Sequence, residues 1–142
     1  MLSVESKVRR RGLPVTAMRR ALRPLLKKAG GRDLELVIVG SRAMRRLNRE
    51  HHHCDATTDV LAFPGDGRVL LGSVVVCTDV ALRESKARGL SLASEMALYA
   101  VHGTLHLMGH RDDSPAGSRR MRQAEVRALR AAGLSTDRLE RP

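Results

Sequence analysis

Hydrophobic and polar residues follow different spacings in the first third of the chain, and each spacing predicts a structural element. Residues 2–8 alternate weakly, which predicts an edge strand. Val15–Lys28 has helical spacing, although Pro24 lies inside it and is expected to kink or split the helix. Residues 34–39 are apolar without interruption, as in a central strand, and Ser41 is expected to cap a short helix after it.

The middle of the chain has the pattern of two further strands. Residues 60–63 and 69–77 are rich in apolar residues, many of them β-branched, and a Pro-Gly-Asp-Gly turn at 64–67 separates them. Thr78 is expected to cap a helix after the second strand, and Gly89 is expected to end it. This region therefore predicts a strand pair followed by a helix.

Two more helices are predicted in the last third of the chain. The helix that begins at Ser91 is apolar on almost all sides, which is typical of a helix buried in the middle of a fold, and Gly109 is expected to end it. Ser114-Pro115 forms a cap followed by proline at the first helical position, so the last helix should run from there to Gly133. Residues 135–142 are predicted to be a frayed tail.

These elements follow one another in the order β-α-β-α-β-β-α-α-α. The order predicts an α/β fold, in which helices pack on a mixed sheet of about four strands. The length of 142 residues suits one hydrophobic core, so residues 1–142 are expected to form a single compact domain. The helix that begins at Ser91 should lie at its centre.

The charge of the chain narrows the class of partner. Lysine and arginine number 26 against 15 aspartates and glutamates, which gives a net charge of +11. Such a charge favours RNA as a partner over the alternative, an arginine-rich composition that serves solubility. Basic residues expected to hold an RNA backbone include Arg9, Arg10, Arg11, Arg19, Arg20, Lys27 and Lys28. The alternative is that many of them are solvated helix faces.

Aromatic residues are nearly absent, since Phe63 is the only phenylalanine and Tyr99 the only tyrosine, and there is no tryptophan. A platform on which RNA bases stack is therefore not expected. RNA affinity should be mainly electrostatic and weakly sequence-dependent. Sequence specificity should then come mainly from the ribosome or another partner.

The cysteines and the apolar runs indicate a compartment. Cys54 and Cys77 are too few for a disulfide framework, which favours a reduced, cytoplasmic protein. Residues 1–13 lack the apolar segment of a signal peptide, and no apolar run reaches the roughly 18 residues of a membrane span. We therefore expect no membrane partner, whereas the oligomeric state is not indicated.

The most informative chemistry is a histidine pair near the end of the predicted central helix. His102 and His106 are four residues apart, so both project from one face, at a spacing that suits two imidazoles on one metal ion. After the break at Gly109, either Asp112 or Asp113 can supply a third ligand, and His110 is also within reach. Two histidines and one carboxylate, with a fourth position for water, are typical of catalytic zinc.

The alternative is that these histidines are satisfied core residues. A buried helix that carries two imidazoles at ligand spacing, followed by a glycine and a polar cluster, makes metal binding the favoured interpretation. The related protease motif requires glutamate directly after the first histidine, and this chain has Gly103 there. A protease of that class is therefore disfavoured.

The sequence His102-Gly-Thr-Leu-His106-Leu-Met-Gly109 resembles the signature of the YbeY family of metal-dependent endoribonucleases. The segment from Thr58 to Pro64, Thr-Asp-Val-Leu-Ala-Phe-Pro, is similar to a second block of that family. The resemblance covers residues 34 to about 134. Further positions that match the family are Leu47, Asn48, Asp55, Gly72, Met121 and Glu125.

The resemblance implies a zinc-dependent endoribonuclease that cleaves single-stranded RNA during maturation of ribosomal RNA, at the 3′ end of 16S rRNA, and in ribosome quality control. It implies one zinc ion per chain. In the family the third ligand lies ten residues after the first, which is Asp112 here. The implied ligands are therefore His102, His106 and Asp112, and the implied partners are precursor rRNA and the ribosome or its small-subunit proteins.

Three departures from the family pattern bear on the site. Asp112 replaces the usual histidine, keeps a zinc-binding group and would admit a harder metal. The usual Tyr-Arg pair appears as His51-His52, so a protonated His52 could replace the arginine that contacts RNA phosphate, which makes His52 the candidate catalytic residue. Ser73 stands where an acidic residue usually follows Gly72.

Two other functions stay open. A metal-dependent hydrolase of small molecules would need a neutral or acidic entrance to its site, which the charge of +11 disfavours. A non-enzymatic ribosome-binding metalloprotein would need a fourth ligand that closes the metal site, from His110 or Asp113. For RNA cleavage, the sequence does not choose between direct hydrolysis and attack by a ribose 2′-hydroxyl.

Overall fold

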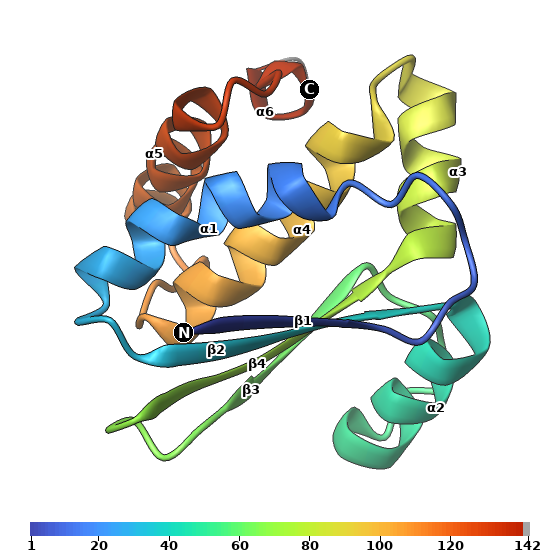
Figure 1. Cartoon of the computed structure of the whole chain (residues 1–142), viewed down its shortest axis with the longest axis horizontal. Helices are drawn as coiled ribbons and strands as arrows, with labels where there is room; N and C mark the ends of the chain where they lie inside the picture. Colours follow the sequence, from blue (N-terminus) through green and yellow to red (C-terminus); the bar gives the residue numbers. More distant parts are fainter. Residues whose placement is uncertain (141–142) are drawn as a thin grey trace.

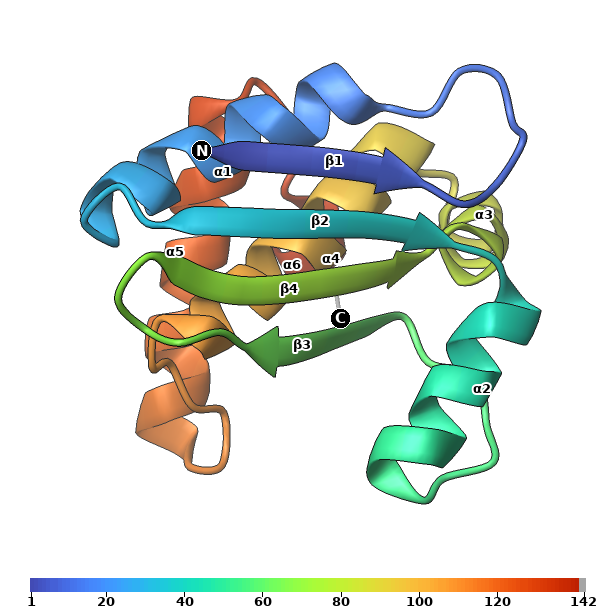
Figure 2. The ribbon, with the colours of Figure 1, turned by 60° about the horizontal axis from the view of Figure 1, so that its bottom comes forward.

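The computed structural model describes residues 1–140, and four of its segments form one sheet (Figures 1 and 2). The strands lie in the order β1-β2-β4-β3, with β1 and β2 parallel, β2 and β4 parallel, and β3 antiparallel to β4. Their bounds are β1 Leu2–Ser6, β2 Asp33–Val39, β3 Val60–Pro64 and β4 Leu70–Cys77. The predicted mixed sheet of four strands is confirmed, with β1 at an edge and β2 inside.

The helices pack mainly on one face of this sheet. Figure 1 shows α1, α4 and α5 over that face, while α2 lies beyond the end where β2 finishes. The bounds are α1 Val15–Lys28, α2 Ser41–His52, α3 Thr78–Arg88, α4 Leu92–Leu107, α5 Pro115–Ala131 and α6 Asp137–Glu140. None of these helices is both long and apolar enough to cross a bilayer.

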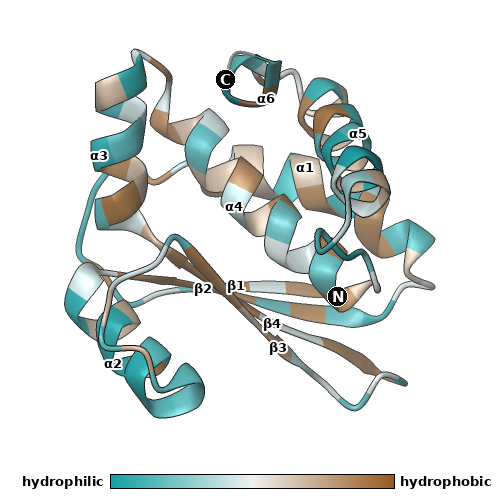
Figure 3. Ribbon diagram, turned by 180° about the vertical axis from the view of Figure 1, so that it is seen from behind, coloured by the Kyte–Doolittle hydropathy of each residue, from teal (hydrophilic) through white to brown (hydrophobic). Residues whose placement is uncertain are grey.

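Helix α4 is the central helix that the sequence predicts. It packs on β3 and β4 below it and against α1, α3 and α5 around it. Its middle from Met96 to Val101 is buried throughout, which explains why apolar residues occur on all of its sides. In Figure 3 the strands are largely hydrophobic, whereas much of the surface of α2 and α5 is hydrophilic.

Pro24 does not split α1, so that half of the prediction is wrong. The helix continues from Val15 to Lys28 around it. Pro24 is exposed, so the carbonyl that loses its hydrogen bond to the missing N–H can bind water instead. The opposite face keeps the helix in place through five buried residues: Met18, Ala21, Leu22, Leu25 and Leu26.

Two predicted caps also differ from the structure. Helix α2 begins at Ser41 itself, and the Asp79 carboxylate accepts the Ser41 backbone N–H at 2.7 Å in place of a local cap. Thr78 is likewise the first residue of α3, and the preceding Cys77 makes no side-chain cap. By contrast, Ser114 caps α5 as predicted, because its Oγ accepts the Gly117 N–H at 3.0 Å.

The C-terminal segment is more ordered than the predicted frayed tail. Residues 137–140 form α6, while residues 141–142 of that tail lie outside the described part of the chain. Arg138 Nε lies 3.0 Å from Glu95 Oε1, and Glu95 is fully buried in α4. The ion pair between Arg138 and the buried Glu95 therefore ties the tail to the central helix. The same carboxylate lies beside the Tyr99 hydroxyl, and burial together with this negative charge raises the pKa of Tyr99.

We expect Arg138→Ala to lower the free energy of unfolding by about 2 kcal/mol, because it leaves the buried Glu95 charge without its cationic partner. The loss should fall below that of a fully buried pair, since the Arg138 side chain is 30% exposed. Chemical denaturation measures it. Arg130→Ala is the control, because its ion pair with Glu140 is exposed and should contribute less than about 1 kcal/mol. If both variants lose the same free energy of unfolding, the buried pair with Glu95 stabilises the protein no more than an exposed ion pair does.

Candidate metal centre

The last turns of α4 place the two histidines side by side. His102 Nε2 and His106 Nε2 are 3.1 Å apart, and their ring centroids are 4.6 Å apart. Their side chains are 30% and 35% exposed, so both rings lie at the edge of the core, where solvent can reach them. The i, i+4 spacing therefore brings together the pair that the sequence predicts.

The loop after α4 adds the carboxylate. Helix α4 ends at Leu107, and Gly109 adopts a positive φ of 98°, which turns the chain back toward the helix. Asp112 Oδ2 then lies 3.8 Å from His106 Nε2, and one ligand atom from each of His102, His106 and Asp112 lies within 4.8 Å of the others. The structure thus brings together the three residues chosen from the sequence.

The group has room for one cation. Zinc bound through two Nε2 atoms at about 2.0–2.1 Å in tetrahedral geometry holds the nitrogens roughly 3.3 Å apart. The 3.1 Å separation of His102 and His106 is close to that requirement. Neither His110 nor Asp113 belongs to the group, so it contains three candidate ligands among the described residues.

Helix α5 contributes a residue whose role the sequence did not reveal. Glu125 Oε2 lies 2.9 Å from His102 Nδ1, and Glu125 is 7% exposed. Held this way, Nδ1–H points at the carboxylate and Nε2 faces the centre of the group. Glu125 lies 23 residues after His102, so spacing gives no sign of the contact, although the family resemblance includes this position.

The Glu125 contact also changes the acidity of His102. The hydrogen bond to Glu125 is the main influence, and with the negative charges of Glu125, Asp59 and Asp112 it raises the pKa of His102 above the ordinary 6.5. Partial burial opposes the shift. Because a metal binds only the unprotonated ring, protons should compete with a metal at His102 more strongly than at an ordinary histidine.

Two glycines allow the close approaches on which this geometry depends. A Cβ on Gly103 would lie 2.7 Å from Val74 Cγ1 and 3.1 Å from Val60 Cγ2, so this position of α4 faces the sheet. The glutamate of the protease motif has no space there, which agrees with the sequence argument against a protease. A Cβ on Gly117 would lie 2.4 Å from the Arg111 carbonyl oxygen, so α5 meets the Asp112 loop at a glycine.

His52 is the last residue of α2 and is not a member of the group. It is exposed, and its ring centroid is 6.3 Å from that of Phe63 in β3, while His51 is 5.0 Å from the same ring. Within residues 1–140 no hydrogen bond or ion pair joins His52 to His102, His106 or Asp112. The role of His52 therefore stays a prediction.

Asp55, another position that matches the family, is exposed and accepts hydrogen bonds from the Arg45 guanidinium, which lowers the pKa of its carboxyl.

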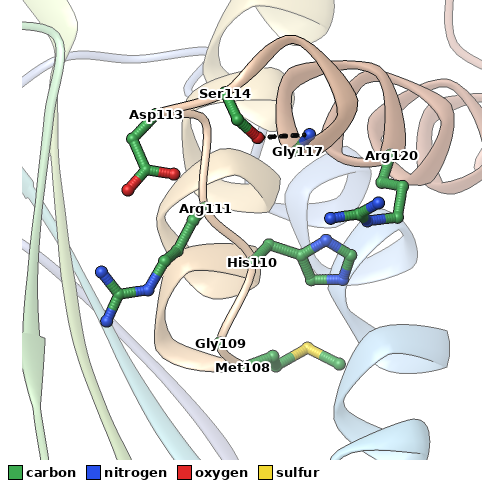
Figure 4. Close-up of a pocket in the computed structure, with 8 residues that line it drawn as sticks. All are labelled: Met108, Gly109, His110, Arg111, Asp113, Ser114, Gly117 and Arg120. Atoms are coloured by element: carbon green, nitrogen blue, oxygen red, sulfur yellow. Dashed lines mark hydrogen bonds between the residues drawn. The ribbon is translucent and has the colours of Figure 1, made fainter.

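Two hollows lie along the loop between α4 and α5. One of about 290 Å³ is lined by His106 and residues 109–113, so it includes Asp112. The second, of about 380 Å³, lies between this loop and the start of α5 (Figure 4). In Figure 4 the His110 ring points toward Arg120, on the other side of the loop from the Arg111 guanidinium. The sequence left His110 open as a metal ligand, and in the structure it is not part of the group of candidate ligands.

The fold and this group define a class: an α/β protein with a candidate metal centre on a buried helix that crosses a mixed sheet. Comparison with known sequences gives the family. The profile described as Endoribonuclease YbeY matches residues 8–133. This chain belongs to the YbeY family.

Individual relatives agree with this assignment. The chain is 44% identical over 117 residues to the Endoribonuclease YbeY of Myxococcus xanthus, and 35% identical over 134 residues to that of Chlorobium phaeovibrioides. The first match covers 78% of this chain and 40% of the relative, and the second covers 92% and 90%. A further match, to the Endoribonuclease YbeY of an Anaeromyxobacter strain, covers 55% of that relative. The chain therefore spans about half the length of several relatives that it matches.

A solved structure has the same fold. The solution structure of TM1509 from Thermotoga maritima superposes with a TM-score of 0.71 at 20% sequence identity. The superposition covers 93% of this chain and 89% of the other. It supports the arrangement of sheet and helices described above.

We expect Glu125→Gln to lower the pKa of His102 in protein freed of metal by a chelator, because the carboxylate that stabilises the imidazolium is gone. Since the folded pKa is raised, the pair's contribution to stability is complete below pH 6.5 and disappears as the pH rises through the raised value. The variant should therefore lose most stability under acidic conditions. NMR titration of the histidine rings measures the shift, with His110 as an internal reference. An unchanged His102 titration would contradict the assignment.

Proposed function

We propose that this chain is a metal-dependent endoribonuclease that cleaves single-stranded RNA. The observation that carries the proposal is the convergence of His102, His106 and Asp112 at the end of α4 in a chain of the YbeY family. We further propose zinc as the metal, one ion per chain. Precursor rRNA, at the 3′ end of 16S rRNA, is the proposed substrate, and the ribosome or its small-subunit proteins are the proposed partners in the cytoplasm.

The residues of the centre would divide the work. When bound, zinc supplies a Lewis acid and an acidified water near neutral pH. His102 and His106 would hold the metal through Nε2, and Asp112 would add a negative charge. Glu125 fixes the orientation of His102 through Nδ1 and makes the ring a stronger ligand. Both direct hydrolysis and attack by the ribose 2′-hydroxyl are compatible with this arrangement.

Two observations favour this function over the alternatives. A structural metal in a non-enzymatic protein would have a fourth protein ligand, and the group of described residues has three. A small-molecule hydrolase would not need the large positive charge of this chain, +11, whereas an RNA backbone is attracted by it. The endoribonuclease therefore accounts for both the centre and the charge.

Zinc content of purified variants tests the ligand set. We expect His102→Ala, His106→Ala and Asp112→Ala each to lose most bound zinc, because three ligands hold the ion and two do not suffice. Asp113→Ala, the neighbouring carboxylate outside the group, is the matched control and should keep about one zinc per chain. Asp112→His should also keep it. Elemental analysis after dialysis measures the content.

If Asp112→Ala keeps its full zinc content and Asp113→Ala loses zinc, the assignment of Asp112 as the third ligand is wrong. Cleavage of a labelled single-stranded RNA by the same proteins tests the activity and should follow the zinc content. Zinc-loaded wild type that binds ribosomal subunits but cleaves no RNA would instead support the non-enzymatic function.

The proposed phosphate contact of His52 has its own test. Arginine carries a permanent charge and suits phosphate, so His52→Arg should cleave RNA at least as well as the wild type. His52→Ala should lower cleavage severalfold while zinc content stays the same. His51→Ala, on the preceding residue, is the comparison and should have the smaller effect. Equal rates for wild type and His52→Ala would mean that His52 does not contribute.

A further inference from the structure

The exposed side of α5 is a surface of arginines. Arg119, Arg122, Arg127 and Arg130, with Gln123 and Val126, line a hollow of about 420 Å³, and no acidic residue lines it. We call these four arginines the α5 arginine face. The other side of the helix is buried and carries the one acidic residue of α5, Glu125, which contacts His102.

Most of this charge has no partner inside the protein. Among residues 1–140, no hydrogen bond or ion pair involves the side chains of Arg119, Arg122 or Arg127. Arg130 alone is paired, with Glu140 at 2.7 Å. Like charges three or four residues apart repel one another by a few tenths of a kcal/mol each on a helix. Acidic groups of the protein do little to offset this repulsion, so binding of an external anion would relieve it.

The α5 arginine face begins beside the loop that carries Asp112. Helix α5 starts at Pro115, directly after this loop, and Ser118, the residue before Arg119, donates a hydrogen bond from Oγ to the Asp112 carbonyl oxygen at 3.1 Å. From Pro115 the helix runs for 17 residues, about 25 Å. A polyanion bound along this face would therefore have one end next to the loop that carries Asp112.

We propose that the α5 arginine face binds the phosphate backbone of the RNA substrate and leads it to the metal centre. This inference rests on the proposed function and adds the path of the substrate. The absence of aromatic residues from the hollow fits contacts to phosphates, which do not depend on base identity. The ligand class is single-stranded RNA, in preference to an anionic membrane or an acidic protein.

The path differs from the one expected from the N-terminal basic residues. Figures 1 and 2 place the β1–α1 loop, which contains Arg9, Arg10 and Arg11, at the opposite end of the sheet from the loop that follows α4. Arg19 of α1 donates a hydrogen bond to the Leu2 carbonyl oxygen, so part of its capacity is used internally. The β1–α1 loop therefore lies away from the loop that carries Asp112, whereas Lys28, at the end of α1, lines a hollow together with Met108, His110 and Arg127.

Two triple variants of equal charge separate local binding from general attraction. Arg119→Gln/Arg122→Gln/Arg127→Gln and Arg9→Gln/Arg10→Gln/Arg11→Gln each remove three charges from the total of +11. Affinity for a fluorescent single-stranded RNA is measured over a salt series. Each lost phosphate contact should reduce the slope of log affinity against log salt by about 0.7, so the α5 variant should lose roughly 2. The loop variant should lose much less.

Equal reductions in both variants, or none in the α5 variant, would overturn the proposal. The salt series is repeated with the triple α5 substitution in Asp112→Ala, where the loss of salt dependence caused by the α5 substitutions should persist although RNA cleavage is lost. The cleavage assay therefore tests the proposed nuclease function, and the slope of log affinity against log salt tests the proposed binding of RNA along α5. Vesicles containing phosphatidylserine form the second arm: if the α5 variant loses vesicle binding while its RNA slope is unchanged, the face binds membranes and the proposal is wrong.

Discussion

The contact between α4 and the sheet at Gly103 determines where the rest of the centre can lie. Only a residue without a side chain allows the helix to rest on Val74 and Val60 at this distance. His102 precedes this contact and is turned toward α5, while His106 follows one turn later on the same side. Asp112 and Glu125 reach the imidazoles from a loop attached to α4 and a helix that packs on α4, so the arrangement of the site rests on where α4 lies.

Local features of the sequence were sufficient for much of this arrangement. The strands and most helix bounds follow from apolar runs, caps and glycines, because these signals act over a few residues. The convergence of His102 and His106 follows from helix geometry alone. Asp112 and Asp113 are adjacent, and spacing could not separate them; the family resemblance favoured Asp112, and the structure places that residue in the group.

Features that depend on contacts between distant segments could not be predicted in this way. The Glu125 contact joins two helices, and the Glu95–Arg138 pair joins α4 to a tail that the sequence suggested was frayed. Pro24 was expected to disrupt α1, but the burial of the opposite face outweighs one lost hydrogen bond. Nothing in the sequence indicated that the arginines of α5 form one surface beside the Asp112 loop, because that proximity depends on the fold.

The loop between α4 and α5 gives the centre a mechanical character. The two histidines belong to α4, whereas Asp112 lies in the loop and Glu125 belongs to α5. An ion held by His102, His106 and Asp112 would join the loop to the end of α4 and would thereby fix where α5 begins relative to α4. Glu125 contacts His102 itself rather than the ion, so this contact would keep the outer side of α5 in the same direction when the site is empty.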